Sequence, residues 1–78
     1  MPQYPSMKAR ELRRVLEGQT LGYVVERQKG SHAVLVSEKG YPRLVWAFHD
    51  GQTLPPGLVR TILKNQVGLS DEDALALL

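Results

Sequence analysis

A histidine, a serine and two basic residues lie close together in the segment RQKGSHAVLV, residues 27–36. Arg27 and Lys29 come just before Gly30, Ser31 and His32. The imidazole of a histidine titrates at about pH 6.5 in model peptides, so it can take a proton from a ribose 2′-hydroxyl or give one to a leaving 5′-oxygen. A neighbouring lysine or arginine can stabilise the charge on the transferring phosphoryl group. These residue types are sufficient for metal-independent cleavage of RNA.

The same residues have a plainer interpretation, in which Gly30 makes a turn and His32 merely begins a strand. A Ser31–His32 nucleophilic pair is disfavoured, because adjacent strand residues point to opposite faces. Metal hydrolysis needs more ligands than His32, His49 and Asp50 supply, so we predict neither a metal nor a cofactor.

Composition limits the class of protein. At 78 residues without cysteine, the chain is expected to form one domain stabilised by packing and to reside in the reducing cytoplasm. It has no apolar stretch of the roughly 20 residues that span a bilayer, and its start, MPQYPS, does not resemble a signal peptide. Residues 1–70 contain ten cations and five acids. This excess suits a polyanionic partner such as RNA, although mildly basic small domains are common.

The elements that would position His32 follow from hydrophobic periodicity. A helix is expected over 7–20, with Ser6 as a possible N-cap and Gly22 as its left-handed stop. Its apolar stripe is Ala9, Leu12, Val15 and Leu16. The opposite side is arginine-rich and is either a solvated surface or one that faces RNA.

Three strands are predicted at 23–28, 33–37 and 43–48, and their short connections favour an antiparallel meander. Trp46 and Phe48 share a strand face and are interpreted as core residues. Because both faces of the sheet carry apolar residues, one should cover the helices and the other is a candidate interface.

After a loop at 49–55, a second helix is expected from Pro56 to Val67, ended by Gly68. Ser70 then caps a short terminal helix whose first turn is acidic, so the acidic cluster needs no catalytic explanation. The resulting order, α-β-β-β-α, predicts an α+β domain with helices on one face of a three-stranded antiparallel sheet. Residues 1–6 are expected to form a flexible arm, and 7–78 a single domain.

Four segments in this order resemble the HicA-type (YcfA-like) mRNA interferase toxins of toxin–antitoxin systems. They are MKARELRRVLE, LGYVVERQKGSH, the segment ending in His49, and LPPGLVRTILKNQVGLSDEDALALL. The resemblance implies a fold similar to double-stranded-RNA-binding domains, an endoribonuclease that cleaves mRNA without a metal, and catalysis by His32. It also implies a HicB-type antitoxin as partner, and contact with DNA only through the antitoxin complex.

The residues predicted to contact RNA include the histidine segment and three positions outside it: Arg27, Lys29, Gly30, Ser31, Arg43, His49 and Lys64. Two other functions stay open at this point. One is an RNA-binding module of the same fold that does not cleave. The other is a protein that acts mainly through its antitoxin complex, with the free apolar face of the sheet as the interface.

Overall fold

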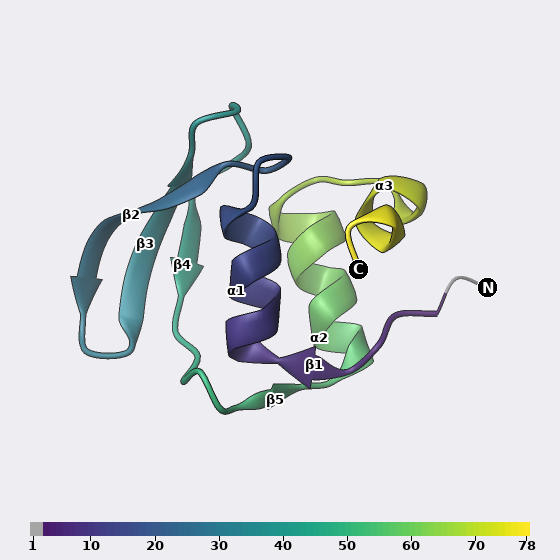
Figure 1. Cartoon of the computed structure of the whole chain (residues 1–78), viewed down its shortest axis with the longest axis horizontal. Coiled ribbons are helices and arrows are strands. Elements are labelled where there is room, and N and C mark those ends of the chain that lie inside the picture. Colours follow the sequence, from purple (N-terminus) through teal and green to yellow (C-terminus); the bar gives the residue numbers. More distant parts are fainter. Residues whose placement is uncertain (1–2) are drawn as a thin grey trace.

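Three neighbouring strands form the central sheet, and along two of them buried residues alternate with more exposed ones. In the computed structural model, which describes residues 3–78, they are β2 (Tyr23–Lys29), β3 (His32–Ser37) and β4 (Leu44–Trp46), in the order β2-β3-β4 (Figure 1). Both pairings are antiparallel, so the predicted meander is confirmed. The structured part of β4 is shorter than expected, while β2 and β3 each extend one residue further toward their hairpin.

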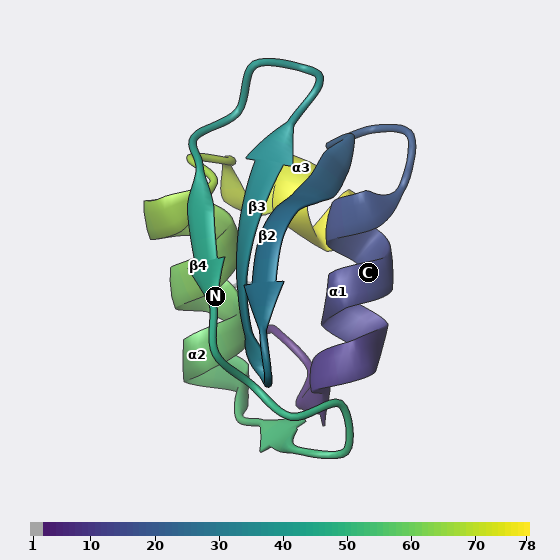
Figure 2. The same ribbon diagram turned by 90° about the vertical axis from the view of Figure 1, so that its left-hand side faces the viewer.

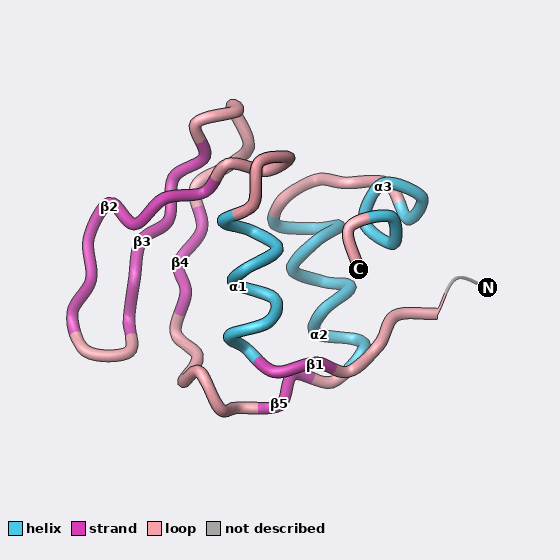
Figure 3. Tube along the Cα trace, viewed as in Figure 1, coloured by secondary structure: helices cyan, strands magenta, loops and turns pink. Residues whose placement is uncertain are grey.

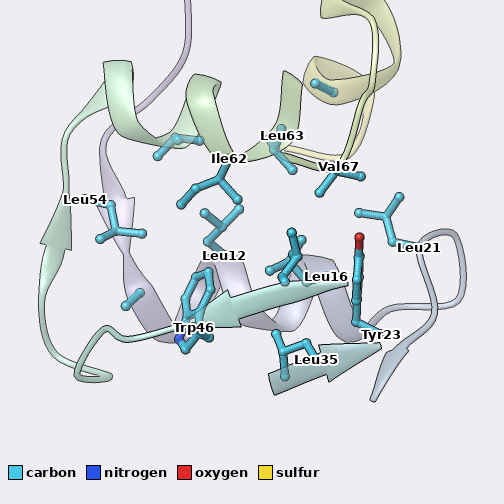
Figure 4. Packing of buried hydrophobic residues seen from close by; sticks show 14 of the residues in the cluster. Leu12, Leu16, Leu21, Tyr23, Leu35, Trp46, Leu54, Ile62, Leu63 and Val67 are labelled. Carbon is cyan, nitrogen blue, oxygen red and sulfur yellow. The ribbon is translucent and has the colours of Figure 1, made fainter. Parts of the chain in front are cut away.

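One face of this sheet packs against the helices. Ala33 pairs with Trp46 and Leu35 pairs with Leu44, and all four side chains are buried. In Figure 4, Trp46 lies next to Leu12 and Leu35 lies near Leu16, both leucines of the helix over residues 9–17. The confirmed fold is α+β, and the inner face and the helix stripes form one continuous core.

Helix α1 (Ala9–Glu17) begins two residues later than the sequence predicted. The residues before it, Met7–Lys8, form strand β1, which pairs with β5 (Thr53–Leu54). The first N–H groups of the helix donate hydrogen bonds to the turn at residues 50–52. The Ala9 N–H donates to the Gln52 carbonyl at 2.8 Å, and the Arg10 N–H donates to the Asp50 carbonyl at 3.2 Å. A distant loop therefore performs the role predicted for Ser6.

The end of α1 also differs from the prediction. The helix stops at Glu17, and Gly18 follows in an extended conformation. Gly22 does adopt a left-handed φ of 65°, but in the turn that leads into β2. Its N–H donates to the Gly18 carbonyl at 2.8 Å, so this glycine shapes the α1–β2 connection and does not end the helix.

The predicted second helix contains two kinds of helix. Helix α2 (Pro56–Thr61) continues directly into the π-helix η1 (Ile62–Gln66), and Gly68 follows with a left-handed φ of 93°. The wider π turn lets Val67 donate to the Ile62 carbonyl at 3.0 Å, with both side chains buried. The short helix α3 (Asp71–Ala76) is capped as predicted, because the Ser70 hydroxyl accepts from the Asp73 N–H at 3.1 Å.

The N-terminal segment is not the free arm expected from its prolines. Residues 1 and 2 lie outside the described residues, but Tyr4 is buried and its hydroxyl donates to the Asp71 carboxylate at 2.6 Å. Burial and this hydrogen bond raise the pKa of Tyr4. Hydrogen bonds from Tyr4 and Lys64 hold the pKa of the Asp71 carboxyl below its ordinary value. The segment from Gln3 to Ser6 thus reaches the side of the helix layer where α3 lies (Figure 1).

Candidate functional site

A tight hairpin carries His32. Strands β2 and β3 pair as far as Lys29 and His32, and Gly30 and Ser31 alone connect them. Gly30 has a left-handed φ of 61°, which a two-residue turn needs and which glycine adopts without strain. The Gln28 side-chain amide donates to the Gly30 carbonyl at 3.2 Å. The hairpin therefore holds His32 firmly at the start of a strand.

His32 lies on the face of the sheet that the helices leave free. Along β3, His32, Val34 and Val36 alternate with the buried Ala33 and Leu35. Figure 2 views the sheet from this side, with both helices behind it. Because the pleat alternates, burial of one set of residues directs the other set outward. We call this the outer face.

The outer face is apolar in its centre. Val34 pairs with Val45 on one side and with Arg27 on the other. Val45 is 67% exposed, and Val24 is 40% exposed. Large apolar side chains so open to solvent are typical of surfaces that bind a partner. The candidate interface predicted from the strands is thus present as an apolar strip beside His32.

An open depression of about 350 Å³ lies at the hairpin end of this face. It is lined by basic, histidine and valine side chains together with Gln28: Arg27, Lys29, His32, Val34 and Val45. We call it the histidine depression. The two cations predicted to assist His32 therefore lie beside it.

A second depression, of about 310 Å³, lies at the tip of the hairpin and is called the loop depression. Gly30, Ser31 and His49 all line it, although His49 is far away in the sequence. Asp50 and the partly buried Phe48 also line it. Both belong to the loop after β4, which Figure 3 traces as far as β5. One end of the sheet thus brings together four residues predicted to form the site, namely Gly30, Ser31, His32 and His49.

Arg43 and Lys64 do not join them. Arg43 comes just before β4, at the other end of the outer face, and pairs with Glu26 at 3.1 Å. Lys64 is in η1, within the helix layer, and its ammonium pairs with Asp71 at 3.1 Å. An opposing carboxylate already satisfies each cation, and neither residue lines the histidine or loop depression.

Sequence reasoning missed Gln28. Gln28 lines both depressions and bonds the hairpin turn. Its position between Arg27 and Lys29 is the only signal that singles it out. Trp46 is buried, as predicted, and Phe48 packs edge-on against it at 5.0 Å between ring centroids while keeping a partly exposed face.

Residues 3–78 contain neither a metal-ligand cluster nor a membrane-spanning helix. No group of three or more histidine and acidic side chains is placed to hold a metal ion. No helix in this part of the chain is long and apolar enough to cross a membrane.

A three-stranded antiparallel sheet backed by two helices, with a histidine and cations on its free face, defines a small α+β domain compatible with the fold of double-stranded-RNA-binding domains. The model of the family described as HicA toxin of bacterial toxin-antitoxin matches residues 9–69. The chain belongs to this family, as its motifs predicted, and is the toxin of a toxin–antitoxin pair. Comparison with curated proteins and with solved structures gives no significant match.

Proposed function

We propose that this toxin is a metal-independent endoribonuclease that cleaves mRNA, with His32 as its general acid or base. The observation that carries the proposal is the histidine depression, where His32, Arg27 and Lys29 surround one open space. An exposed imidazole beside two cations has the groups that phosphodiester cleavage requires.

The proposed reaction uses the ribose 2′-hydroxyl as nucleophile. Its oxygen forms a bond to phosphorus while the bond from phosphorus to the 5′-oxygen breaks, which leaves a 2′,3′-cyclic phosphate and a free 5′-hydroxyl. The 2′-hydroxyl loses a proton and the 5′-oxygen gains one. If His32 is neutral, it takes the proton from the 2′-hydroxyl and water protonates the 5′-oxygen. If His32 is protonated, it gives its proton to the 5′-oxygen and water accepts the proton of the 2′-hydroxyl. Lys29 and Arg27 stabilise the negative charge on the phosphoryl oxygens.

The hairpin explains how the chain positions these groups. Lys29 and His32 are directly paired across β2 and β3. Side chains of such a pair point to the same face of the sheet. Gly30 and Ser31 add no large side chain at the tip, so a phosphodiester can approach the backbone there.

The outer face also supports a second proposal, for the antitoxin partner. A HicB-type antitoxin would bind the apolar strip around Val34 and Val45 and cover the histidine depression. The exposure of Val45 supports this, since a valine 67% exposed beside other valines gains free energy by burial. Inhibition would then follow from occlusion of His32.

The test of the nuclease proposal is cleavage of a purified RNA by the wild-type toxin and by His32→Ala. We expect the variant to be slower by about 10²- to 10⁴-fold, the usual contribution of one acid or base. An RNA with 2′-deoxyribose at the cleaved position should resist the wild type, and the natural product should carry a cyclic phosphate.

Lys39→Ala is the control, because Lys39 is exposed in the turn after β3 and lines neither the histidine depression nor the loop depression. Equal rates for wild type and His32→Ala would contradict the catalytic role. If neither protein cleaves and both bind RNA equally, the chain is the non-cleaving RNA-binding module.

A further inference from the structure

The arginine-rich side of α1 forms a third depression against the edge of the sheet. Its volume is about 420 Å³, and its lining combines side chains of α1 with two from the sheet and the loop: Arg10, Arg13, Arg14, Glu17, Gln28 and Asp50. In Figure 2, α1 stands beside β2, on the edge of the sheet opposite β4. We call this the arginine depression.

The arginine and loop depressions adjoin each other, because Arg13, Gln28 and Asp50 line both. The loop depression is also lined by Gly30 and Ser31, the two residues that lead directly to His32. A path therefore runs from the exposed arginines of α1 to the hairpin tip beside His32. We call this path the channel.

Cations in the channel are available to a ligand. Within the described part of the chain, Arg10 and Arg14 are exposed and have no acidic side chain within ion-pair distance. Arg13 is different, because its guanidinium pairs with Glu17 at 3.3 Å and is largely buried. Four residues apart, Arg10 and Arg14 project from the same side of the helix.

The two walls of the channel are fixed to each other. The Arg10 N–H donates to the Asp50 carbonyl, and the Gln52 N–H donates to the His49 carbonyl at 2.9 Å. The Lys8 ammonium also donates to the Gly51 carbonyl at 3.3 Å. The 49–52 turn is therefore held against the start of α1, so the channel exists before a ligand arrives, which lowers the entropy that binding costs.

Phe48 adds an aromatic surface midway along the channel. Its ring lies at 79° to that of Trp46, which is buried and holds Phe48 edge-on. Phe48 is partly exposed and lines the loop depression. Cations that follow a backbone, combined with an aromatic ring on which a base can stack, are the features by which proteins bind single strands.

We propose that the channel binds single-stranded RNA beyond the scissile bond, with Arg10 and Arg14 contacting phosphates and Phe48 stacking on a base. The inference rests on the proposed function, since it extends the strand from the phosphodiester at His32. Gln28 and Asp50 are hydrogen-bonding groups on the same path and meet the ribose or base edges between the phosphates. The toxin therefore requires an unpaired strand longer than the cleavage site itself.

The experiment compares Arg10→Gln/Arg14→Gln with a matched control, Lys39→Gln/Arg60→Gln, which removes two exposed cations outside the channel. Binding is measured in the His32→Ala background with fluorescein-labelled single-stranded RNAs of about 4 and about 16 nucleotides, the range of known single-strand sites. The slope of log K against log salt should fall by about 1.4 for the longer RNA, at about 0.7 for each lost phosphate contact. The defect should be larger for the longer RNA, and the control should match wild type.

Equal affinities and slopes for the channel variant and wild type would overturn the proposal, as would an equal loss in the control, which would indicate nonspecific attraction. Loss of antitoxin binding with normal RNA binding would also overturn it, because the surface would then be a protein interface. If the wild type cleaves no RNA but the Arg10→Gln/Arg14→Gln variant still shows the length-dependent binding defect, only the nuclease proposal is contradicted.

Discussion

The two faces of the sheet are built from the same strands but have opposite properties. On the inner face, Ala33 and Leu35 are buried against the helices, within the hydrophobic core. On the outer face, the adjacent residues His32 and Val34 meet solvent and cations. The strand alternation lets one set of residues supply stability while the other set is free for chemistry. A substitution on each face should therefore affect different measurements.

The largest effect on stability is expected for the inner face. Leu35→Ala removes a side chain that is 0% exposed and should destabilise the protein by about 2–5 kcal/mol. Val45→Ala, on the outer face, should change the free energy of unfolding by less than about 0.5 kcal/mol. Urea unfolding followed by far-UV circular dichroism measures both. Similar losses for the two variants would show that the faces do not differ as described.

A smaller effect, in binding alone, is expected when charge is added to the outer face. Val45→Asp should weaken the complex with a co-expressed HicB-type antitoxin at least about 10-fold, or about 1.4 kcal/mol, because an unpaired carboxylate would be buried. Isothermal titration calorimetry measures the affinity. Gln19→Asp adds the same charge in an exposed turn after α1 and should leave the affinity unchanged. Unchanged binding by Val45→Asp would move the antitoxin interface away from this face.

The smallest effect is expected far from both faces, at the Tyr4–Asp71 hydrogen bond. The pKa of Asp71 is lowered by Tyr4, so its contribution to stability is present above the unfolded value of 3.8 and is lost as the pH falls through the folded value. The pKa of Tyr4 is raised above 10.0, so its contribution is present below pH 10.0 and is lost as the pH rises through the folded value.

Tyr4→Phe should therefore be less stable than wild type between these pH values, and the difference should shrink in stronger acid and in stronger base. Urea titrations at a series of pH values, read by Trp46 fluorescence, test this pattern. Tyr41→Phe removes a hydroxyl elsewhere and is the control. A difference that does not depend on pH would contradict the linkage between Tyr4 and Asp71.

Local sequence patterns predicted most of the sheet and the helix faces. The alternation around Leu35, the stripe at Leu12 and Leu16, and the Ser70 cap each depend on residues a few positions apart. Such patterns are readable because side-chain direction repeats with the period of the strand or helix. The motifs around His32 and after Pro55 likewise indicated the family that the comparison with family models then established.

Long-range contacts decided the features that the sequence did not reveal. Strand β1 exists because Met7 pairs with Leu54. Tyr4 is held in place because its hydroxyl donates a hydrogen bond to the Asp71 carboxylate. No local periodicity records a partner more than forty positions along the chain, so these interactions shifted the start of α1 and ordered the N-terminal segment.

The sequence by itself determined which residues could do chemistry, because His32, Arg27 and Lys29 lie within one hairpin, where register alone brings them to one face. Only the tertiary structure decided what surrounds them. The arginines of α1 meet the hairpin tip because the helix packs beside β2 and the 49–52 turn accepts hydrogen bonds from its first N–H groups. Residues from three separate segments meet there through packing, which depends on the whole core.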